Sequence, residues 1–120
     1  MTGTLALVGS GEYLPEMIEL ERMLLEKGLQ HGKEPTFVQI PTAAGLEGQK
    51  RLEYWKDLGS EQALRLGVEP LFLPVFTRDD ANNPEILKHV EKSALVYLSG
   101  GNPTYLAESL RDTLLAKVMI

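Results

Sequence analysis

The sequence predicts an α/β fold in which a mostly parallel sheet carries helices on both faces. Four short apolar runs alternate with four longer segments whose apolar residues recur at helical spacing. Each run ends in a turn of small residues or proline, and the connections are short apart from residues 74–83. A chain of 120 residues, 43% of them hydrophobic, suffices for one core. We therefore expect a single doubly wound domain over residues 1–120, with flavodoxin-like strand order.

Composition excludes several classes of function. Seventeen acidic residues against 12 Lys and Arg give a net charge of −5, and no basic run occurs, which disfavours nucleic acid and membrane partners. The absence of cysteine excludes disulfides, thiolate zinc sites and a Cys nucleophile in these residues. The dinucleotide fingerprint and the P-loop are both missing, so we expect no cofactor and no metal. The first residues lack the basic region of a signal peptide, and we expect a cytoplasmic protein.

The amino-terminal part reads as strand, helix, strand. The run Leu5–Val8 predicts a buried strand that ends in the glycine turn Gly9–Glu12. Helical spacing then predicts a helix from Pro15 to a stop at Gly28. Residues 36–40 predict a second strand, which ends in the small-residue turn Pro41–Gly45.

The segment from Glu47 to Leu66 has an approximate helical apolar face that Gly59 interrupts. It is either two helices, the second capped by Ser60, or one long helix with a tolerated glycine. Leu71–Leu73 then predicts a third strand.

After the polar loop 74–83, Asn83 and Pro84 predict the start of a short helix that ends near Glu91. The all-apolar run Ala94–Leu98 predicts a fourth strand. Asn102 is a suitable N-cap for a last helix, with Pro103 at its first position. In a strand order second, first, third, fourth, the run Ala94–Leu98 lies at the sheet edge, where it invites self-association.

The carboxyl edge of such a sheet is where ligands bind, and four turns meet there in the prediction. In Ser99–Asn102, Gly100 and Gly101 present bare N–H groups at a helix N-terminus, which favours an anion or an oxyanion. Glu12 follows the first glycine turn, where its carboxylate either recognises an amine or guanidinium or caps the next helix. Ser10 is favoured as a turn residue over a nucleophile, because Gly-x-Ser-x-Gly occurs nowhere in the chain.

Other polar or aromatic positions favour ordinary structural roles. His31 and His89 lack a serine or acid at motif spacing, and we expect surface or packing roles for both. The charged stretch Arg78–Asp80 is more typical of a solvated turn than of a site that binds a charged substrate. Tyr54 and Trp55 fall within the helical pattern, which predicts packing.

Three of these turns resemble a known family. Ala6–Glu12, Ile40–Gly45 and Leu98–Asn102 followed by Leu106 resemble, in the same order, the serine peptidase family of dipeptidase E and cyanophycinase. The resemblance implies a fold like that of class I glutamine amidotransferases. It also implies hydrolysis of small peptides or isopeptides, typically beside an aspartyl residue.

In that family the nucleophilic serine lies in a Gly-x-Ser-Ala-Gly turn on the following strand, with its histidine and acid later still. The resemblance therefore covers the amino-terminal half of a family member, and we expect this chain to be inactive alone. It implies that Gly101, with Gly100, contributes to an oxyanion hole, and that Asn102 flanks the substrate. Ser10 and Thr42, in the turns at the same edge, are further candidates for substrate binding. Pro103 stands where the family more often has glutamine or threonine.

Two further hypotheses stay open at this point. The same turn suits a binding module that holds a phosphate or carboxylate without breaking a bond. It also suits a subunit of a glutamine amidotransferase-like assembly that another chain completes.

Overall fold

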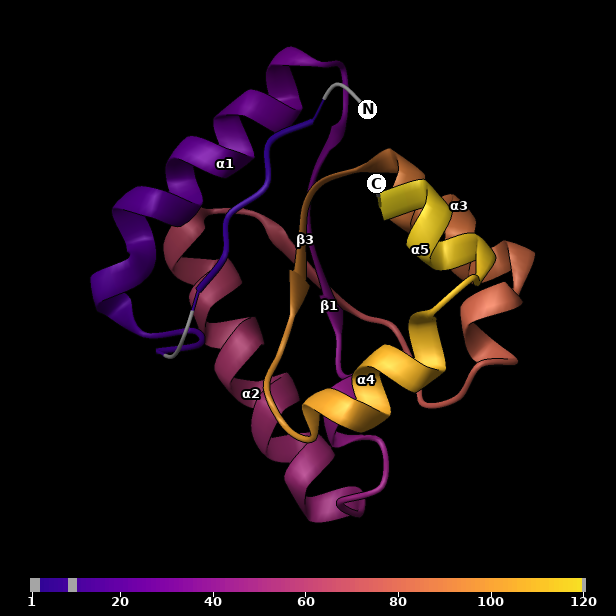
Figure 1. Cartoon of the computed structure of the whole chain (residues 1–120). Helices are drawn as coiled ribbons and strands as arrows, with labels where there is room; N and C mark the ends of the chain where they lie inside the picture. The colour runs from indigo at the N-terminus through magenta and orange to yellow at the C-terminus, as the bar shows by residue number, and fades with distance from the viewer. Residues whose placement is uncertain (1–2, 9–10, 120) are drawn as a thin grey trace.

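A computed structural model describes residues 3–8 and 11–119 (Figure 1). The elements follow one another as η1 (Pro15–Met17), α1 (Ile18–Gln30), β1 (Glu34–Ile40), η2 (Thr42–Ala44), α2 (Gln49–Leu66), β2 (Glu69–Phe72), η3 (Asp80–Asn82), α3 (Pro84–Lys92), β3 (Ser93–Leu98), α4 (Pro103–Leu110) and α5 (Leu114–Met119).

The described strands form one parallel sheet in the order β2-β1-β3. Side chains of β1 alternate between the two faces, as the period of a strand requires. Phe37 packs with the helices α1 and α2, whereas Val38 and Ile40 pack with α3, α4 and α5. Figure 1 shows these two groups of helices on opposite sides of the sheet. The predicted α/β class with helices on both faces is confirmed.

The predicted first strand is wrong for the residues that the structure describes. Residues 3–8 form no strand, and Leu5 and Leu7 are 73% and 90% exposed. Figure 1 draws this segment as coil. An apolar run forms a strand only where a neighbour pairs with it. β1 is already paired on both sides, and residues 3–8 do not pair with the outer edge of β2 or of β3. The turn residues Gly9 and Ser10 lie outside the described residues.

The predicted strand order is corrected as a consequence. With residues 5–8 outside the sheet, β1 takes the centre, and the run Ala94–Leu98 lies within the edge strand β3, as expected. The chain leaves β1 for β2 on one side and then crosses to β3 on the other. The direction of winding therefore reverses between β1 and β3, and the crevice at such a switch point is where α/β sheets bind ligands.

Between Gln49 and Leu66 the structure has one helix, α2, and not two. Gly59 lies inside it, and a Cβ at this position would overlap the side-chain amide of Gln39. That amide is buried and donates from Nε2 to the Trp55 carbonyl at 2.9 Å. Gly59 is thus tolerated because its missing side chain makes room for a polar residue of β1.

The helix α1 extends past Gly28, which corrects the predicted stop. The chain turns at Gly32 instead, where φ is +79°, and the Gly32 N–H donates to the Leu29 carbonyl. Gly28 has a different role, because a Cβ there would lie 2.7 Å from the Ala94 Cα. The glycine lets α1 approach the backbone of β3.

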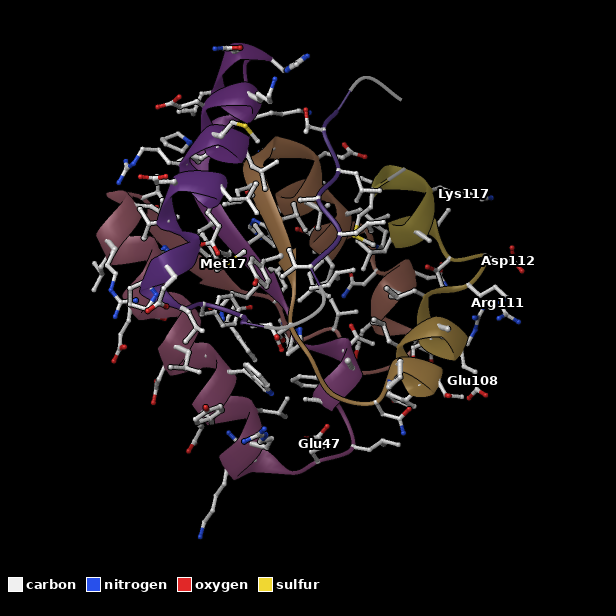
Figure 2. All side chains as sticks on the ribbon, turned by 60° about the vertical axis from the view of Figure 1, so that its left-hand side comes forward. Met17, Glu47, Glu108, Arg111, Asp112 and Lys117 are labelled. Carbon is white, nitrogen blue, oxygen red and sulfur yellow. The ribbon has the colours of Figure 1, made fainter. Side chains whose placement is uncertain are left out.

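The last helix is interrupted, which the leucine spacing does not predict. α4 ends at Leu110, and Asp112 has φ of 59°. Thr113 is fully buried, and the Leu114 N–H donates to Asn82 Oδ1 at 2.9 Å, which starts α5. Figure 2 shows Arg111 and Asp112 on the outer side of this link.

One carboxylate is buried between α1 and α2. Glu21 is 2% exposed, and its Oε1 accepts from Gln62 Nε2 at 2.8 Å, while Oε2 has no partner among the described residues. Burial raises the pKa of Glu21, and the bond from Gln62 opposes this only in part.

We expect the stability of the Glu21→Gln variant, relative to the wild type, to increase as the pH rises. The folded pKa lies above the unfolded value of about 4.3, so the wild type loses stability as the pH rises from that value through the folded pKa. Glutamine cannot ionise and escapes this loss. Urea unfolding between pH 4 and pH 8 tests the prediction, with the exposed Glu26→Gln on the same helix as the control for charge removal. A stability difference that stays constant with pH, or shrinks as pH rises, contradicts it.

Candidate functional site

The turns at the carboxyl edge of the sheet meet at the switch point between β1 and β3. The Ser99 N–H donates to the Ile40 carbonyl at 3.3 Å, and the Asn102 N–H donates to the Ala43 carbonyl at 2.8 Å. The turn after β3 therefore rests on the turn after β1. The loop 74–83 joins them, because Tyr105 Oη donates to the Phe76 carbonyl.

Gly101 occupies a position that only glycine fits. Its φ is +150°, and a Cβ would lie 2.8 Å from the Ala44 nitrogen and closer still to the Ala43 carbonyl. Two backbone segments pass each other here without room for a side chain. Any larger residue must lift the turn after β3 away from η2.

Of the four backbone N–H groups in the turn 99–102, two have acceptors among the described residues and two do not. The N–H groups of Ser99 and Asn102 are bonded to the turn after β1. Among the described residues, those of Gly100 and Gly101 find no acceptor. Asn102 Oδ1 accepts from the Tyr105 N–H at 3.0 Å, so the predicted N-cap is confirmed. Within the described residues, two adjacent N–H groups without an acceptor thus lie beside the N-terminus of α4.

Glu12 lies against this turn, because a Cβ on Gly100 would overlap its carboxylate. The next residue, Tyr13, has φ of +62°, an uncommon conformation for a side chain of this size. This backbone kink allows the Tyr13 ring to enter the core while Glu12 stays half-buried at the edge. The position predicted from the sequence is confirmed, whereas the recognition of an amine by Glu12 stays a prediction.

Three buried polar groups lie directly beneath the glycine turn. Tyr13 Oη, Gln39 Oε1 and Ser99 Oγ have no hydrogen-bond partner of good geometry in the described part of the chain. Burial raises the pKa of Tyr13 well above its usual range, although the side chains of Gln39 and Ser99 lower it in part. A neutral phenol therefore lies between an amide and a hydroxyl.

Aromatic rings form the floor around these groups. The ring centroids of Tyr13 and Tyr97 are 4.4 Å apart, and Tyr97 stacks on Phe37 at 5.8 Å. Burial, together with the nearby carboxylates of Glu21 and Glu12, raises the pKa of Tyr97 to about 12. Both phenols are neutral at physiological pH and serve as packing surface, not as bases.

The remaining predicted site residues differ in their placement. Thr42 is fully buried, and its hydroxyl donates to the Val75 carbonyl at 2.7 Å, so it ties two turns of the edge together. Its contact with a substrate stays a prediction. Ser10 lies outside the described residues.

Arg78 and Asp80 have structural roles in the loop 74–83. Arg78 Nη1 donates to the carbonyls of Glu108 and Arg111, each at 2.7 Å, which satisfies the end of α4. Asp80 accepts from the N–H groups of Phe76 and Thr77 and so shapes the loop. Within the described residues, no group of three His, Cys, Asp or Glu side chains is arranged to hold a metal ion.

Sequence reasoning missed Tyr13, Gln39 and Ser99 as components of the site. Gln39 carried a usable signal, since a glutamine within the apolar stretch Phe37–Ile40 must be buried and requires a partner. Tyr13 gave no such signal in the sequence, because its contacts depend on its own left-handed backbone conformation.

Comparison with known proteins agrees with this geometry. The sequence model of peptidase family S51 matches residues 5–120. A solved structure of a peptidase from an acI-B1 Actinobacterium is similar to this chain at 54% identity with a TM-score of 0.89. The match covers 93% of this chain and 46% of the actinobacterial chain, so the present chain spans less than half the length of that peptidase. No curated protein matches. Because the family match extends over almost all of the chain, the protein belongs to peptidase family S51.

Proposed function

We propose that this chain forms the oxyanion-hole and substrate-pocket half of a serine-type peptidase that acts on small aspartyl peptides or isopeptides. The observation that carries the proposal is the pair of N–H groups at Gly100 and Gly101, which have no acceptor in the part of the chain that the structure describes and lie beside a helix N-terminus at the switch point. Membership of family S51 supports the assignment of this turn to peptide hydrolysis.

In the proposed reaction, the carbonyl oxygen of the scissile bond lies at the Gly101 N–H and gains negative charge as the tetrahedral intermediate forms. A preorganised donor of this kind stabilises the transition state by roughly 3 kcal/mol. Asn102 fixes the donor by capping α4, and Thr42 fixes the turn beneath it. Glu12 and Ser10 border the substrate, with Glu12 facing a positively charged group. The nucleophile comes from outside these residues, since they contain no Gly-x-Ser-x-Gly.

The proposal predicts that the chain alone is inactive and that a complement restores activity. The 120-residue chain is incubated with L-aspartylglycine, and release of amine is followed. The same assay is then run on a fusion of this chain to the second half of the actinobacterial peptidase, which the chain matches at 54% identity. We expect turnover by the fusion only. A soluble, folded fusion without turnover contradicts the hydrolase assignment. Turnover by the chain alone contradicts the inference that the nucleophile lies outside these residues.

A second candidate function is an anion-binding module or a subunit of a glutamine amidotransferase-like assembly. The open edge of β3 favours it, because Leu98 is 39% exposed there and the strand is apolar from Ala94 onward. Self-association through this edge, measured by analytical ultracentrifugation, together with an inactive fusion, favours this candidate. No helix among the described residues is long and apolar enough to cross a membrane, and we propose a cytoplasmic location.

A further inference from the structure

A cationic side chain lies beside the glycine turn on an aromatic surface. Arg51 is on the first turns of α2, and its guanidinium carbon lies 4.6 Å from the Tyr54 ring centroid and 5.2 Å from that of Trp55. The spacings of three and four residues place all three side chains on one face of the helix. The Arg51 side chain is 47% exposed, so a ligand can reach its donors.

The Trp55 ring connects Arg51 to the turn. A Cβ on Gly100 would lie 3.9 Å from Trp55 Cζ2, while the carboxylate of Glu12 touches the same position. Arg51 and Gly100 therefore lie beside the same indole. A positive group and a negative group thus border the ring, next to the two N–H groups that have no acceptor among the described residues.

Two further details distinguish this arrangement from an ordinary surface arginine. Trp55 is only 9% exposed, yet its Nε1 donor has no partner in the described part of the chain. The ion pair of Arg51 Nε with Glu47 Oε1, at 3.5 Å, is exposed and contributes little to stability. Figure 2 shows Glu47 on the loop that leads into α2, at the outer end of the molecule.

We propose that Arg51, held on the rings of Tyr54 and Trp55, is a specificity-determining residue that binds the side-chain carboxylate of the substrate. Arginine suits this role because its planar guanidinium stacks on aromatic rings and still offers paired donors to a carboxylate. Glu12 then faces the ammonium group of the same ligand. The inference rests on the proposed function for its substrate, but it concerns binding and is tested without turnover.

Trp55 makes the test direct, because it is the only tryptophan in the sequence. Its fluorescence is recorded while the 120-residue chain is titrated with L-aspartylglycine or with L-asparaginylglycine, which lacks the carboxylate. We expect a saturable change with the aspartyl peptide at a Kd at least tenfold lower than with the asparaginyl peptide. Arg51→Met is expected to remove this preference, and Arg51→Lys to retain part of it. Lys50→Met, which removes a neighbouring exposed charge, is expected to leave the preference unchanged.

The outcomes separate this inference from the proposed function. No saturable change in the wild type, or an aspartyl preference that survives Arg51→Met, overturns the role of Arg51. An aspartyl preference that is lost equally in Lys50→Met also overturns it, because net charge then explains the effect. Binding that depends on Arg51, combined with an inactive fusion, supports the inference and contradicts only the hydrolase assignment.

Discussion

Gly28→Ala is expected to destabilise the chain by about 2 kcal/mol or more, because α1 touches the backbone of β3 at this glycine. The added Cβ would lie 2.7 Å from both the Cα and the carbonyl carbon of Ala94, and these atoms are fixed in the sheet. Forcing a methyl group into such a contact costs about 3 kcal/mol, whereas alanine gains about 1 kcal/mol in helix propensity. Urea unfolding of the chain measures the difference, and a fall in Tm of roughly 10 °C accompanies it.

Gly59→Ala is the matched control, since it adds the same methyl group to the interior of a helix. Its Cβ meets the end of the Gln39 side chain and not backbone. The amide can move aside, but it is buried and loses its bond to the Trp55 carbonyl, at a cost of about 1 to 3 kcal/mol that the propensity gain of about 1 kcal/mol offsets only in part. We therefore expect Gly59→Ala to lose less stability than Gly28→Ala, about 1 kcal/mol. Equal losses in the two variants would show that α1 does not approach β3 as closely as the structure has it.

These two glycines illustrate what the sequence could and could not predict. Helical spacing correctly predicted that helices occupy the segments around both, because the apolar faces of α1 and α2 pack on the sheet. The role of each glycine depends on which residue lies across the interface, and no local pattern carries that information. The sequence pattern therefore predicts a stop at Gly28, although α1 ends at Gln30 and the chain turns at Gly32.

The first apolar run shows the same limit at the level of the sheet. Leu5–Val8 has the composition of a buried strand, but composition does not say which strand it would pair with. β1 is occupied on both sides, and residues 5–8 do not pair with the open edge of β3. The turns of the candidate site depend less on the sheet order, because the carboxyl ends of parallel strands meet at one edge whatever their order. The turns after β1 and β3 meet there, and Glu12 lies against Gly100 although no described strand precedes it. The contacts of these residues with a substrate stay predictions.

Gly101→Ala in the fusion with the actinobacterial second half is expected to lower kcat by about 100-fold. Alanine keeps the N–H group but displaces it. The added Cβ would lie 2.8 Å from the Ala44 nitrogen, so the turn must move away from η2. Loss of one oxyanion donor costs roughly 100-fold to 1,000-fold in kcat, and a displaced donor is expected at the lower end of that range. The assay of L-aspartylglycine hydrolysis gives kcat and KM separately, and KM should change little.

Gly48→Ala separates the position of the donor from the strain of the backbone. Gly48 also has positive φ, at +94°, but a Cβ there meets no atom within 4 Å. Both variants therefore bear the cost of a side chain in an unfavourable conformation, about 1 kcal/mol, and only Gly101→Ala displaces the turn. We expect Gly48→Ala to lose this stability and to keep its turnover. If both fusions turn over at the same rate, the Gly101 N–H is not the donor to the oxyanion. The turn after β3 would then serve to hold η2 and α4 together, which its bond from Asn102 to the Ala43 carbonyl already does.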